Sequence, residues 1–234
     1  MSRVFKKGRR VLFCAVLVSI AGSILSVLAL RWINPPFTSF MLIRQVEAWQ
    51  SNQGDFRIQY QWRYWNQISP ELLLAVIAAE DQKYPAHYGF DTDSIQHALL
   101  TWQKTGRLRG ASTITQQVAK NLYLWSGRSF LRKVLEAYFS MLLELFLEKK
   151  RILEIYANIV EFGNGIYGAE SASIQYFRRP ARRLTEVQAS QLAAVLPNPR
   201  KYNAGRPSAY VAQRSRWIRR QMAQLGGILY LQNL

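Results

Sequence analysis

The sequence predicts a mostly α-helical fold preceded by one N-terminal transmembrane helix. Residues 11–30 form an apolar run without a charge, and its length matches the hydrocarbon thickness of a bilayer. Later segments repeat apolar residues at helical spacing and are bounded by capping or helix-breaking residues. The 234 residues suffice for one domain with a core, and we find no internal repeat or low-complexity linker.

The chain is strongly basic, with 31 Lys and Arg against 14 Asp and Glu and a net charge of +17. Such an excess implies an anionic partner: nucleic acid, an acidic membrane surface or a phosphorylated substrate. The 7 Trp, 12 Tyr and 11 Phe, interleaved with basic residues, also suit the headgroup region of a bilayer. The single cysteine, Cys14, excludes an intrachain disulfide and a zinc site with two cysteines. With only 2 His, a histidine-rich metal site is not credible.

The N-terminal segment indicates how the chain lies in the membrane. Residues 1–10 carry five basic and no acidic residues, which predicts a cytoplasmic tail before an anchor at 11–32. A weak cleavage-like site at Val27–Ala29 exists, but the run is longer than the apolar region of a cleaved signal. The part outside keeps 26 basic and 14 acidic residues. No chromosome is present there, so anionic lipid or a phosphate-bearing substrate is favoured over nucleic acid.

Residues 33–66 are predicted to form a membrane-proximal segment. A proline pair makes a stiff exit from the membrane, residues 37–49 have helical spacing, and residues 52–55 break it. Residues 56–65 alternate apolar and polar side chains, as a short strand would. Two interpretations stay open: a half-buried edge strand, or an interfacial segment whose Trp and Tyr side chains touch headgroups.

Glu80 and Asp81 are the first candidates for chemistry. The apolar run before them reads as a buried helix, with Ser69 as N-cap and Pro70 at the first helical position. Both carboxylates fall at the C-terminal end, where the helix dipole and apolar neighbours disfavour the ionised form. A carboxylate so placed suits a general base. The alternative is a solvated helix terminus.

A cluster of hydrogen-bonding side chains follows a predicted helix at residues 93–104 and a basic, flexible entry at 107–110. A plain helix N-terminus needs one capping hydroxyl, whereas a phosphate or sugar ligand would use several donors. The cluster comprises Ser112, Thr113, Thr115, Gln116, Gln117, Lys120 and Asn121.

Residues 129–150 are predicted to form one long helix that carries Arg132, Lys133 and Glu136 on one side. Taken alone, this trio is best explained by ordinary ion pairing along a helix. Helical spacing continues over 152–160, and the glycines that follow, Gly163, Gly165 and Gly168, allow tight turns or close backbone approach.

Two more helices complete the expected fold. Residues 186–196 should form an apolar helix capped by Thr185, and residues 208–225 an amphipathic helix closed by two glycines. We interpret the arginines of the last helix as a solvated or lipid-facing basic face: Arg214, Arg216, Arg219 and Arg220.

Five motifs in order, over about Gln67–Gly227, resemble the peptidoglycan glycosyltransferases (glycosyltransferase family 51). This module is also found in class A penicillin-binding proteins, and here it resembles the monofunctional form. The motifs are Glu80-Asp81 with His87, Gly89 and Asp91; Gly110–Gln117 with Lys120 and Asn121; Arg132–Glu136; Lys150–Tyr156 with Asn158; and Phe162-Gly163 with Gly165, Gly168, Tyr176 and Phe177.

The resemblance implies a lysozyme-like helical glycosyltransferase domain at 67–234 with a small membrane-facing jaw. It implies polymerisation of lipid II into β-1,4-linked glycan, with inversion and release of undecaprenyl diphosphate. The implied place is the inner membrane, with a single span, a cytoplasmic N-terminus and a periplasmic catalytic domain. Expected partners are lipid II, nascent lipid-linked glycan, anionic lipids, and cell-wall synthesis or division proteins, but no nucleic acid. No transpeptidase domain is expected, because the chain stops at Leu234.

By resemblance, Glu80 would be the general base, and Glu136 would sit with Arg132 and Lys133 at the donor diphosphate. There Glu136 would orient the cations or help to hold a divalent ion, Mg or Mn; the sequence assigns no metal ligands and requires no cofactor. The remaining implied substrate contacts are Asp81, Ser112, Thr113, Thr115, Gln116, Gln117, Lys120, Asn121 and Arg128. His87 is expected to be a hydrogen-bonding framework residue.

The chain departs from the family pattern in three places. Tyr84 and Ala157 replace a usual Phe and Leu, which we interpret as packing changes, and His97 stands where an arginine is common. Two rival functions are a membrane-anchored lytic hydrolase and a non-enzymatic scaffold that holds anionic lipid. The hydrolase has no need for the Arg132-Lys133-Glu136 trio, because it binds no diphosphate. The scaffold predicts that Glu80→Gln has no effect except, weakly, on membrane affinity.

Overall fold

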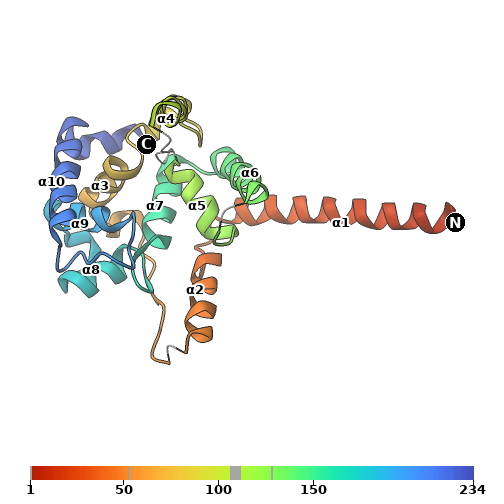
Figure 1. The fold of residues 1–234 in the computed structure, drawn as a ribbon, viewed down its shortest axis with the longest axis horizontal. Coiled ribbons are helices and arrows are strands. Elements are labelled where there is room, and N and C mark those ends of the chain that lie inside the picture. Colours follow the sequence, from red (N-terminus) through yellow and green to blue (C-terminus); the bar gives the residue numbers. More distant parts are fainter. Residues whose placement is uncertain (1, 53, 106–111, 128) are drawn as a thin grey trace.

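A computed structural model describes residues 2–52, 54–105, 112–127 and 129–234. It confirms the mostly α-helical fold: a compact helical body from which one long helix, α1 (Ser2–Ala29), projects (Figure 1). Within α1, Gly8–Ala29 is long and apolar enough to cross a membrane. The basic segment at 107–110, predicted to be flexible, lies outside the described residues.

The body is built around α3 (Pro70–Glu80), whose residues 72–78 are all buried. It packs against α9 (Glu186–Val195) and α10 (Ala209–Gln224). The other helices are α2 (Ser39–Gln50), α4 (Thr92–Thr105), α5 (Ile114–Tyr123), α6 (Phe130–Phe146), α7 (Lys149–Ile159) and α8 (Ala169–Phe177). Short 3-10 helices span Trp65–Gln67, Tyr84–Ala86, Ala181–Arg183 and Gly227–Asn233.

The caps predicted from sequence are present. The Ser69 hydroxyl accepts from the Glu71 amide, and Pro70 occupies the first position of α3. Thr185 forms a capping box with Gln188 at α9, and Gly226 takes the left-handed conformation (φ 93°) after α10. Each cap satisfies backbone groups that a helix end leaves without partners.

The strand expected over 56–65 is wrong in extent: only β1 (Gln59–Tyr60) is a strand. It pairs in parallel with β3 (Ile166–Tyr167), and β2 (Glu161–Gly163) pairs antiparallel on the other side. The Arg63 amide donates to Asn158 Oδ1 (2.7 Å) and the Trp65 amide to Glu154 Oε2 (2.7 Å). Side chains of α7 therefore accept hydrogen bonds from backbone amides that would otherwise pair with a neighbouring strand.

The helix expected over 129–150 is present but ends too late in the prediction: α6 stops at Phe146, and Lys149 already begins α7. Leu147 and Glu148 between them have extended backbone (ψ 145° and 151°). Leu147 is buried, and α6 and α7 both pack against α5. The break lets the chain turn so that two helices cover α5, which one straight helix could not do.

Hydrogen bonds attach α1 and the residues after it to the body. The Ser23 and Tyr138 hydroxyls share a hydrogen bond of 2.7 Å between α1 and α6. Arg151 of α7 donates to Leu30 O (2.9 Å) and Asn34 Oδ1 (2.8 Å), just after α1 ends. Its guanidinium also lies over the Trp62 ring, 5.2 Å from the centroid.

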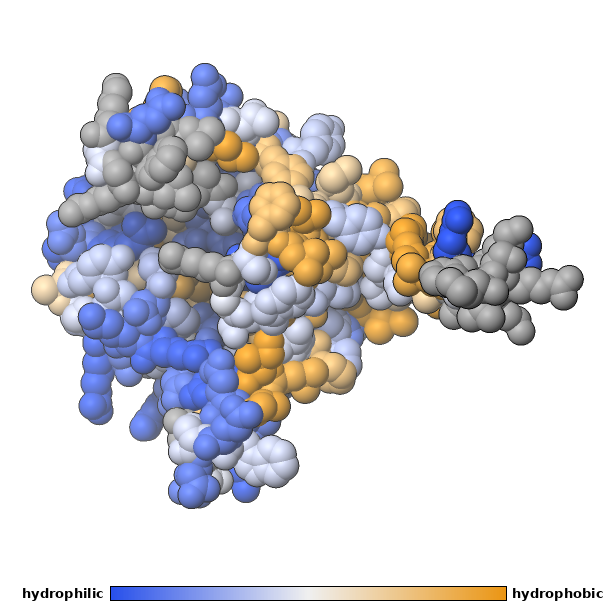
Figure 2. Space-filling view, turned by 45° about the vertical axis from the view of Figure 1, so that its right-hand side comes forward, coloured by the Kyte–Doolittle hydropathy of each residue, from blue (hydrophilic) through white to orange (hydrophobic). Residues whose placement is uncertain are grey.

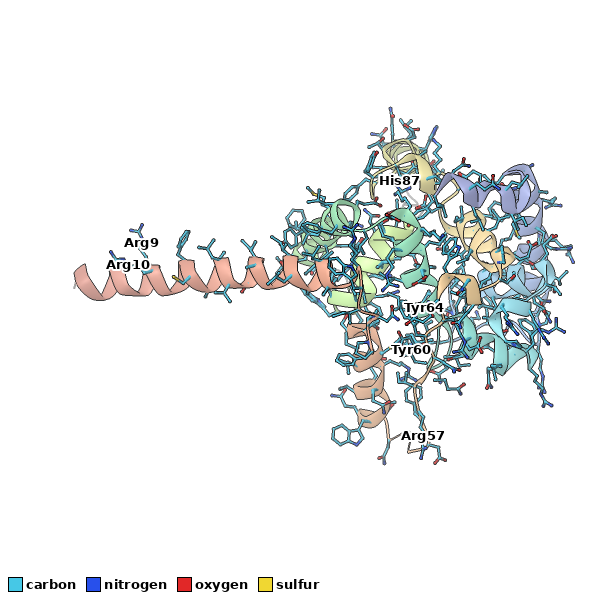
Figure 3. All side chains as sticks on the ribbon, turned by 180° about the vertical axis from the view of Figure 1, so that it is seen from behind. Arg9, Arg10, Arg57, Tyr60, Tyr64 and His87 are labelled. Atoms are coloured by element: carbon cyan, nitrogen blue, oxygen red, sulfur yellow. The ribbon has the colours of Figure 1, made fainter. Side chains whose placement is uncertain are left out.

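Side chains of the membrane-proximal segment divide between body and solvent (Figure 3). Trp62 and Trp65 pack against the hydrophobic core, which favours the half-buried interpretation for both. Tyr64 is exposed, and the Tyr60 hydroxyl donates to Pro35 O (2.7 Å).

The glycines after α7 occupy positions where a side chain does not fit. Gly165 and Gly168 have positive φ (74° and 82°), and a Cβ on Gly168 would lie 2.4 Å from Asn158 O. A Cβ on Gly163 would lie 2.0 Å from Tyr176 Oη and 2.9 Å from Ile166 Cδ1. The expectation of close backbone approach is confirmed at these positions.

Gly163→Ala should therefore lower the free energy of unfolding by about 1–3 kcal/mol, the usual range for overpacking. Tyr176→Phe removes the hydroxyl that the new methyl group meets first, so the loss should be smaller in that background. Thermal or urea unfolding of the four proteins of this cycle measures both effects. An equal loss in the two backgrounds would contradict this account.

Candidate active site

Glu80 is held at the C-terminal end of α3 by a chain of side chains from two other helices. Gln117 Nε2 of α5 donates to Glu80 Oε2 (2.9 Å), and the Tyr156 hydroxyl of α7 donates to Gln117 Oε1 (3.1 Å). Burial raises the pKa of Glu80. The Gln117 hydrogen bond and the charges of Arg214 and Lys120 oppose this rise without cancelling it. The Glu80 carboxylate is therefore protonated more easily than that of a solvent-exposed glutamate.

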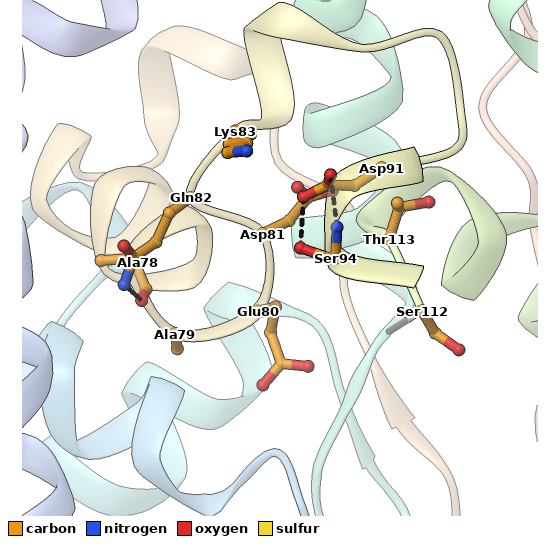
Figure 4. Close-up of a pocket in the computed structure, with 10 residues that line it drawn as sticks. All are labelled: Ala78, Ala79, Glu80, Asp81, Gln82, Lys83, Asp91, Ser94, Ser112 and Thr113. Carbon is orange, nitrogen blue, oxygen red and sulfur yellow. Dashed lines mark hydrogen bonds between the residues drawn. The ribbon is translucent and has the colours of Figure 1, made fainter. Parts of the chain in front are cut away.

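Asp81 points away from Glu80 and has a different environment (Figure 4). Its Oδ1 is 2.9 Å from His87 Nε2, and its Oδ2 accepts from the Ile114 amide (3.0 Å) at the start of α5. The side chain is 2% exposed. Asp81 thus joins the ends of α3 and α5, and His87 has the framework contact expected of it.

A cavity of about 310 Å³ opens beside Glu80, which is within the size range of small-ligand sites (Figure 4). The end of α3 forms one wall, and the starts of α4 and α5 supply the rest. Its lining includes Glu80, Asp91, Ser94 and Ser112, so polar groups surround the space next to the carboxylate.

A cationic cluster lies at the start of α6. Glu136 is buried (3% exposed) and accepts from Arg132 Nη1 (2.7 Å) and Lys133 Nζ. The Arg132 side chain is 14% exposed, compared with 52% for Lys133. The ion pairing expected along the helix is present at both spacings, but it is not a solvent-exposed pairing, because the Glu136 carboxylate is buried.

Lys120 of α5 connects Glu80 with this cluster. Burial lowers the pKa of Lys120, and the charges of Arg132 and Lys133 lower it further. Glu136 and Glu80 oppose this, since each favours the charged ammonium. Lys120 is therefore close enough to interact with both carboxylates, and its ammonium lies 5.6 Å from the Phe40 ring centroid. Lys120 thus couples the charge of Glu80 electrostatically to the cationic cluster.

Several predicted substrate contacts already have partners within the protein. The Thr113 hydroxyl caps α5 and donates to Gly89 O (2.6 Å), and Gln116 Oε1 accepts from the Thr113 amide. The Thr115 hydroxyl donates to Glu144 Oε1 (2.6 Å). These three side chains and Asn121 are buried, whereas Ser112 is exposed.

The structure does not gather the whole predicted set onto one surface. Gln117 and Lys120 adjoin Glu80, while Asp81, Thr113 and Gln116 shape the N-terminus of α5. Arg128 lies outside the described residues, and so does Gly110, the first residue of the second motif. Contact of each residue with substrate stays a prediction.

Arg214 is a site residue that the sequence interpretation missed. The solvated or lipid-facing face expected for α10 is wrong here: Arg214 Nη2 donates to Ala79 O (3.3 Å), and its charge acts on Glu80. Position 214 falls within the buried stripe formed by Val211, Ser215, Ile218 and Met222. Helical spacing could therefore have placed Arg214 against the body.

We find no group of three or more potential metal-ligating His, Cys, Asp or Glu side chains in the part of the chain that the structure describes. Glu136 offers one carboxylate, but Arg132 and Lys133 already contact both of its oxygens. A divalent ion would have to share the Glu136 carboxylate with these two side chains or displace them.

Residues 49–223 match the transglycosylase family. The chain belongs to this family. Its relatives include proteins named "Biosynthetic peptidoglycan transglycosylase" from Ectopseudomonas mendocina (58% identical, covering 91% of this chain and 88% of the relative) and Xanthomonas campestris pv. campestris (51%, 97% and 92%). A third, with the same name, is from Pseudomonas entomophila (56%, 94% and 93%). The matched region of this transglycosylase begins within α2, ahead of the first motif recognised in the sequence.

The environment of Glu80 predicts an unusual effect on stability. Because burial raises the pKa of Glu80 in the folded state above that of a solvent-exposed glutamate, folding favours the protonated form, and stability falls as pH rises through the raised pKa. Glu80→Gln should therefore unfold at a higher temperature than wild type at pH 7.5, and the difference should shrink towards pH 4.

Glu136→Gln is the matched comparison, and it should lose about 1–3 kcal/mol because it leaves the largely buried Arg132 guanidinium without its counter-charge. Thermal unfolding across pH measures both variants. If Glu80→Gln is the less stable protein at pH 7.5, the assigned environment of Glu80 is incorrect.

Proposed function

We propose that this transglycosylase polymerises lipid II into β-1,4-linked glycan strands, with inversion at the donor anomeric carbon and release of undecaprenyl diphosphate. The feature that carries the proposal is the electrostatic coupling of Lys120 to two carboxylates, since the charges of Glu80 and Glu136 both favour its ammonium form. A base and a cationic cluster that share one region suit a transfer in which a proton leaves one side and an anion departs on the other. The names of the relatives support the substrate class.

Glu80 acts as the general base towards the acceptor sugar, which occupies the cavity beside it. The carboxylate takes the proton of the acceptor 4-hydroxyl while that oxygen bonds to the donor anomeric carbon. The raised pKa of Glu80 brings its basicity closer to neutral pH, where proton abstraction is efficient. The hydrogen-bonded Gln117 and Tyr156 fix the orientation of the carboxylate.

Lys120, Arg132 and Lys133 hold the donor diphosphate. As the anomeric C–O bond breaks, its electron pair passes to the diphosphate, and positive charges placed in advance stabilise it. Diphosphate departs without protonation, so Glu136 need not serve as an acid. Its role is to position Arg132 and Lys133, which both contact its carboxylate.

The membrane arrangement follows from α1 and α6. We assign α1 as a single span of the inner membrane, with a basic cytoplasmic N-terminus and a periplasmic catalytic domain after residue 66. α6 packs against α1 and exposes Phe130, Leu131, Met141 and Leu145. Figure 2 shows hydrophobic side chains gathered where the anchor joins the body. The diphosphate cluster therefore adjoins an apolar surface, from which the isoprenoid chain enters the bilayer.

Glu80→Gln should lower the rate of lipid II polymerisation by on the order of 100- to 10,000-fold, because the amide cannot accept the proton. Incorporation of labelled lipid II into polymer, with the full chain in detergent, measures this. Glu148→Gln, which changes an exposed glutamate between α6 and α7, is the control and should retain the wild-type rate. Wild-type activity of Glu80→Gln, or release of glycan fragments instead of polymer, would refute the proposal.

The pH dependence of kcat/KM should be bell-shaped. Glu80 must be ionised, and its raised pKa places the acidic limb above pH 4.5. Lys120 must be protonated, and its lowered pKa places the alkaline limb below pH 10.5. Lys120→Arg, which stays charged at all accessible pH values, should remove the alkaline limb in any activity that it retains. An unchanged alkaline limb in this variant would show that Lys120 does not cause it.

A further inference from the structure

A second basic site lies between α8 and α9, far along the chain from the cationic cluster. Residues 178–183, RRPARR, place four arginines within six residues and contain no acidic residue. We call this segment the distal basic turn. Arg178, Arg182 and Arg183 are exposed, and Arg179 is half-buried.

The backbone of the distal basic turn is fixed by side chains of the body. The Ser173 hydroxyl donates to Arg179 O (2.6 Å), and Glu170 Oε2 accepts from the Ala181 amide (2.8 Å). The Ser69 amide, at the start of α3, donates to Ala181 O (3.1 Å). Ser173, Glu170 and Ala181 are all buried. The arginines are thus presented from a rigid support, which reduces the entropy lost on binding.

The charges of this turn are not neutralised within the described part of the chain, where Arg178, Arg182 and Arg183 make no ion pair. Arg178 also takes the left-handed conformation (φ 54°), which costs a non-glycine residue about 1 kcal/mol. Guanidinium groups recognise carboxylates through paired hydrogen bonds. A rigid array of unpaired arginines therefore suits a partner with many carboxylates.

The position of the distal basic turn excludes the bilayer that α1 enters as its binding partner. α8 and α9 lie at the end of the body opposite α1, and the views from both sides agree (Figures 1 and 3). An exposed surface there faces away from the membrane that α1 enters. In the proposed periplasmic setting, the large anionic polymer on that side is the assembled peptidoglycan wall, whose stem peptides carry carboxylates.

We propose that the distal basic turn binds stem-peptide carboxylates of the assembled wall, so that synthesis at Glu80 takes place against existing peptidoglycan. This inference rests on the proposed function. The turn takes no part in the transfer step, because it contacts α3 at its N-terminus through Ser69, whereas Glu80 lies at the opposite end of that helix.

The test is binding of the full chain, in detergent, to isolated and washed peptidoglycan sacculi. The variant Arg182→Gln/Arg183→Gln should bind roughly tenfold more weakly than wild type. The control Arg216→Gln/Arg220→Gln removes two exposed charges from α10 and should change binding less than twofold. Sacculi whose carboxylates have been converted to amides should lose the wild-type binding. Lipid II polymerisation without sacculi should be the same for both variants and wild type.

Equal weakening by the control would show that only net charge matters, and this would overturn the proposal. The same conclusion follows if the Arg182/Arg183 variant binds sacculi normally, or if it loses affinity for anionic vesicles instead. Shorter glycan products from this variant in the assay without sacculi would identify the nascent strand, and not the wall, as the ligand. Sacculus binding and polymerisation are measured separately, so the two proposals fail separately.

Discussion

The site depends on one electrostatic arrangement, in which the Lys120 ammonium interacts with two carboxylates from different helices. Glu80 comes from α3 and Glu136 from α6, while Lys120 lies on α5 between them. The arrangement exists only if α5 is placed correctly. Asp81 secures one end of α5 through the Ile114 amide, and α6 and α7 pack along its length. The break at Leu147 is therefore as important to the site as the charged residues themselves.

The sequence predicted the helices that have strong boundary signals. Ser69-Pro70 and Thr185 mark starts that the structure reproduces, and apolar runs give the buried faces of α3 and α9. It failed where tertiary contacts override local pattern. Alternation over 56–65 resembles a strand, yet Glu154 and Asn158 hold its amides. Such partners are distant in sequence, so no local pattern reveals them.

The site shows the same division between local and tertiary information. Glu80 could be predicted as a perturbed carboxylate because its helix is apolar and ends there. Burial of Glu136 could not be predicted, because an Arg–Lys–Glu trio at this spacing is equally typical of a solvent-exposed helix. The donor-rich start of α5 is the opposite case, because tertiary structure gives several of its side chains partners within the protein, while their contact with substrate stays a prediction. Much of what suggested a ligand surface, including Thr113 and Gln116, satisfies the helix terminus and its neighbours.

The active site lowers the stability of the protein when no substrate is bound, and this cost is consistent with the proposed binding of an anionic substrate. Burial opposes ionisation of Glu80, while Arg132 Nε and Arg214 Nε are buried without hydrogen-bond partners among the described residues. Buried donors without partners cost about 1–3 kcal/mol each. An anionic substrate that approached Arg132 would supply acceptors and counter-charge together, so part of the binding energy would come from relieving this strain. Stability is provided elsewhere, by the apolar packing of α3 with α9 and α10, and that packing allows the site to remain incomplete until substrate arrives.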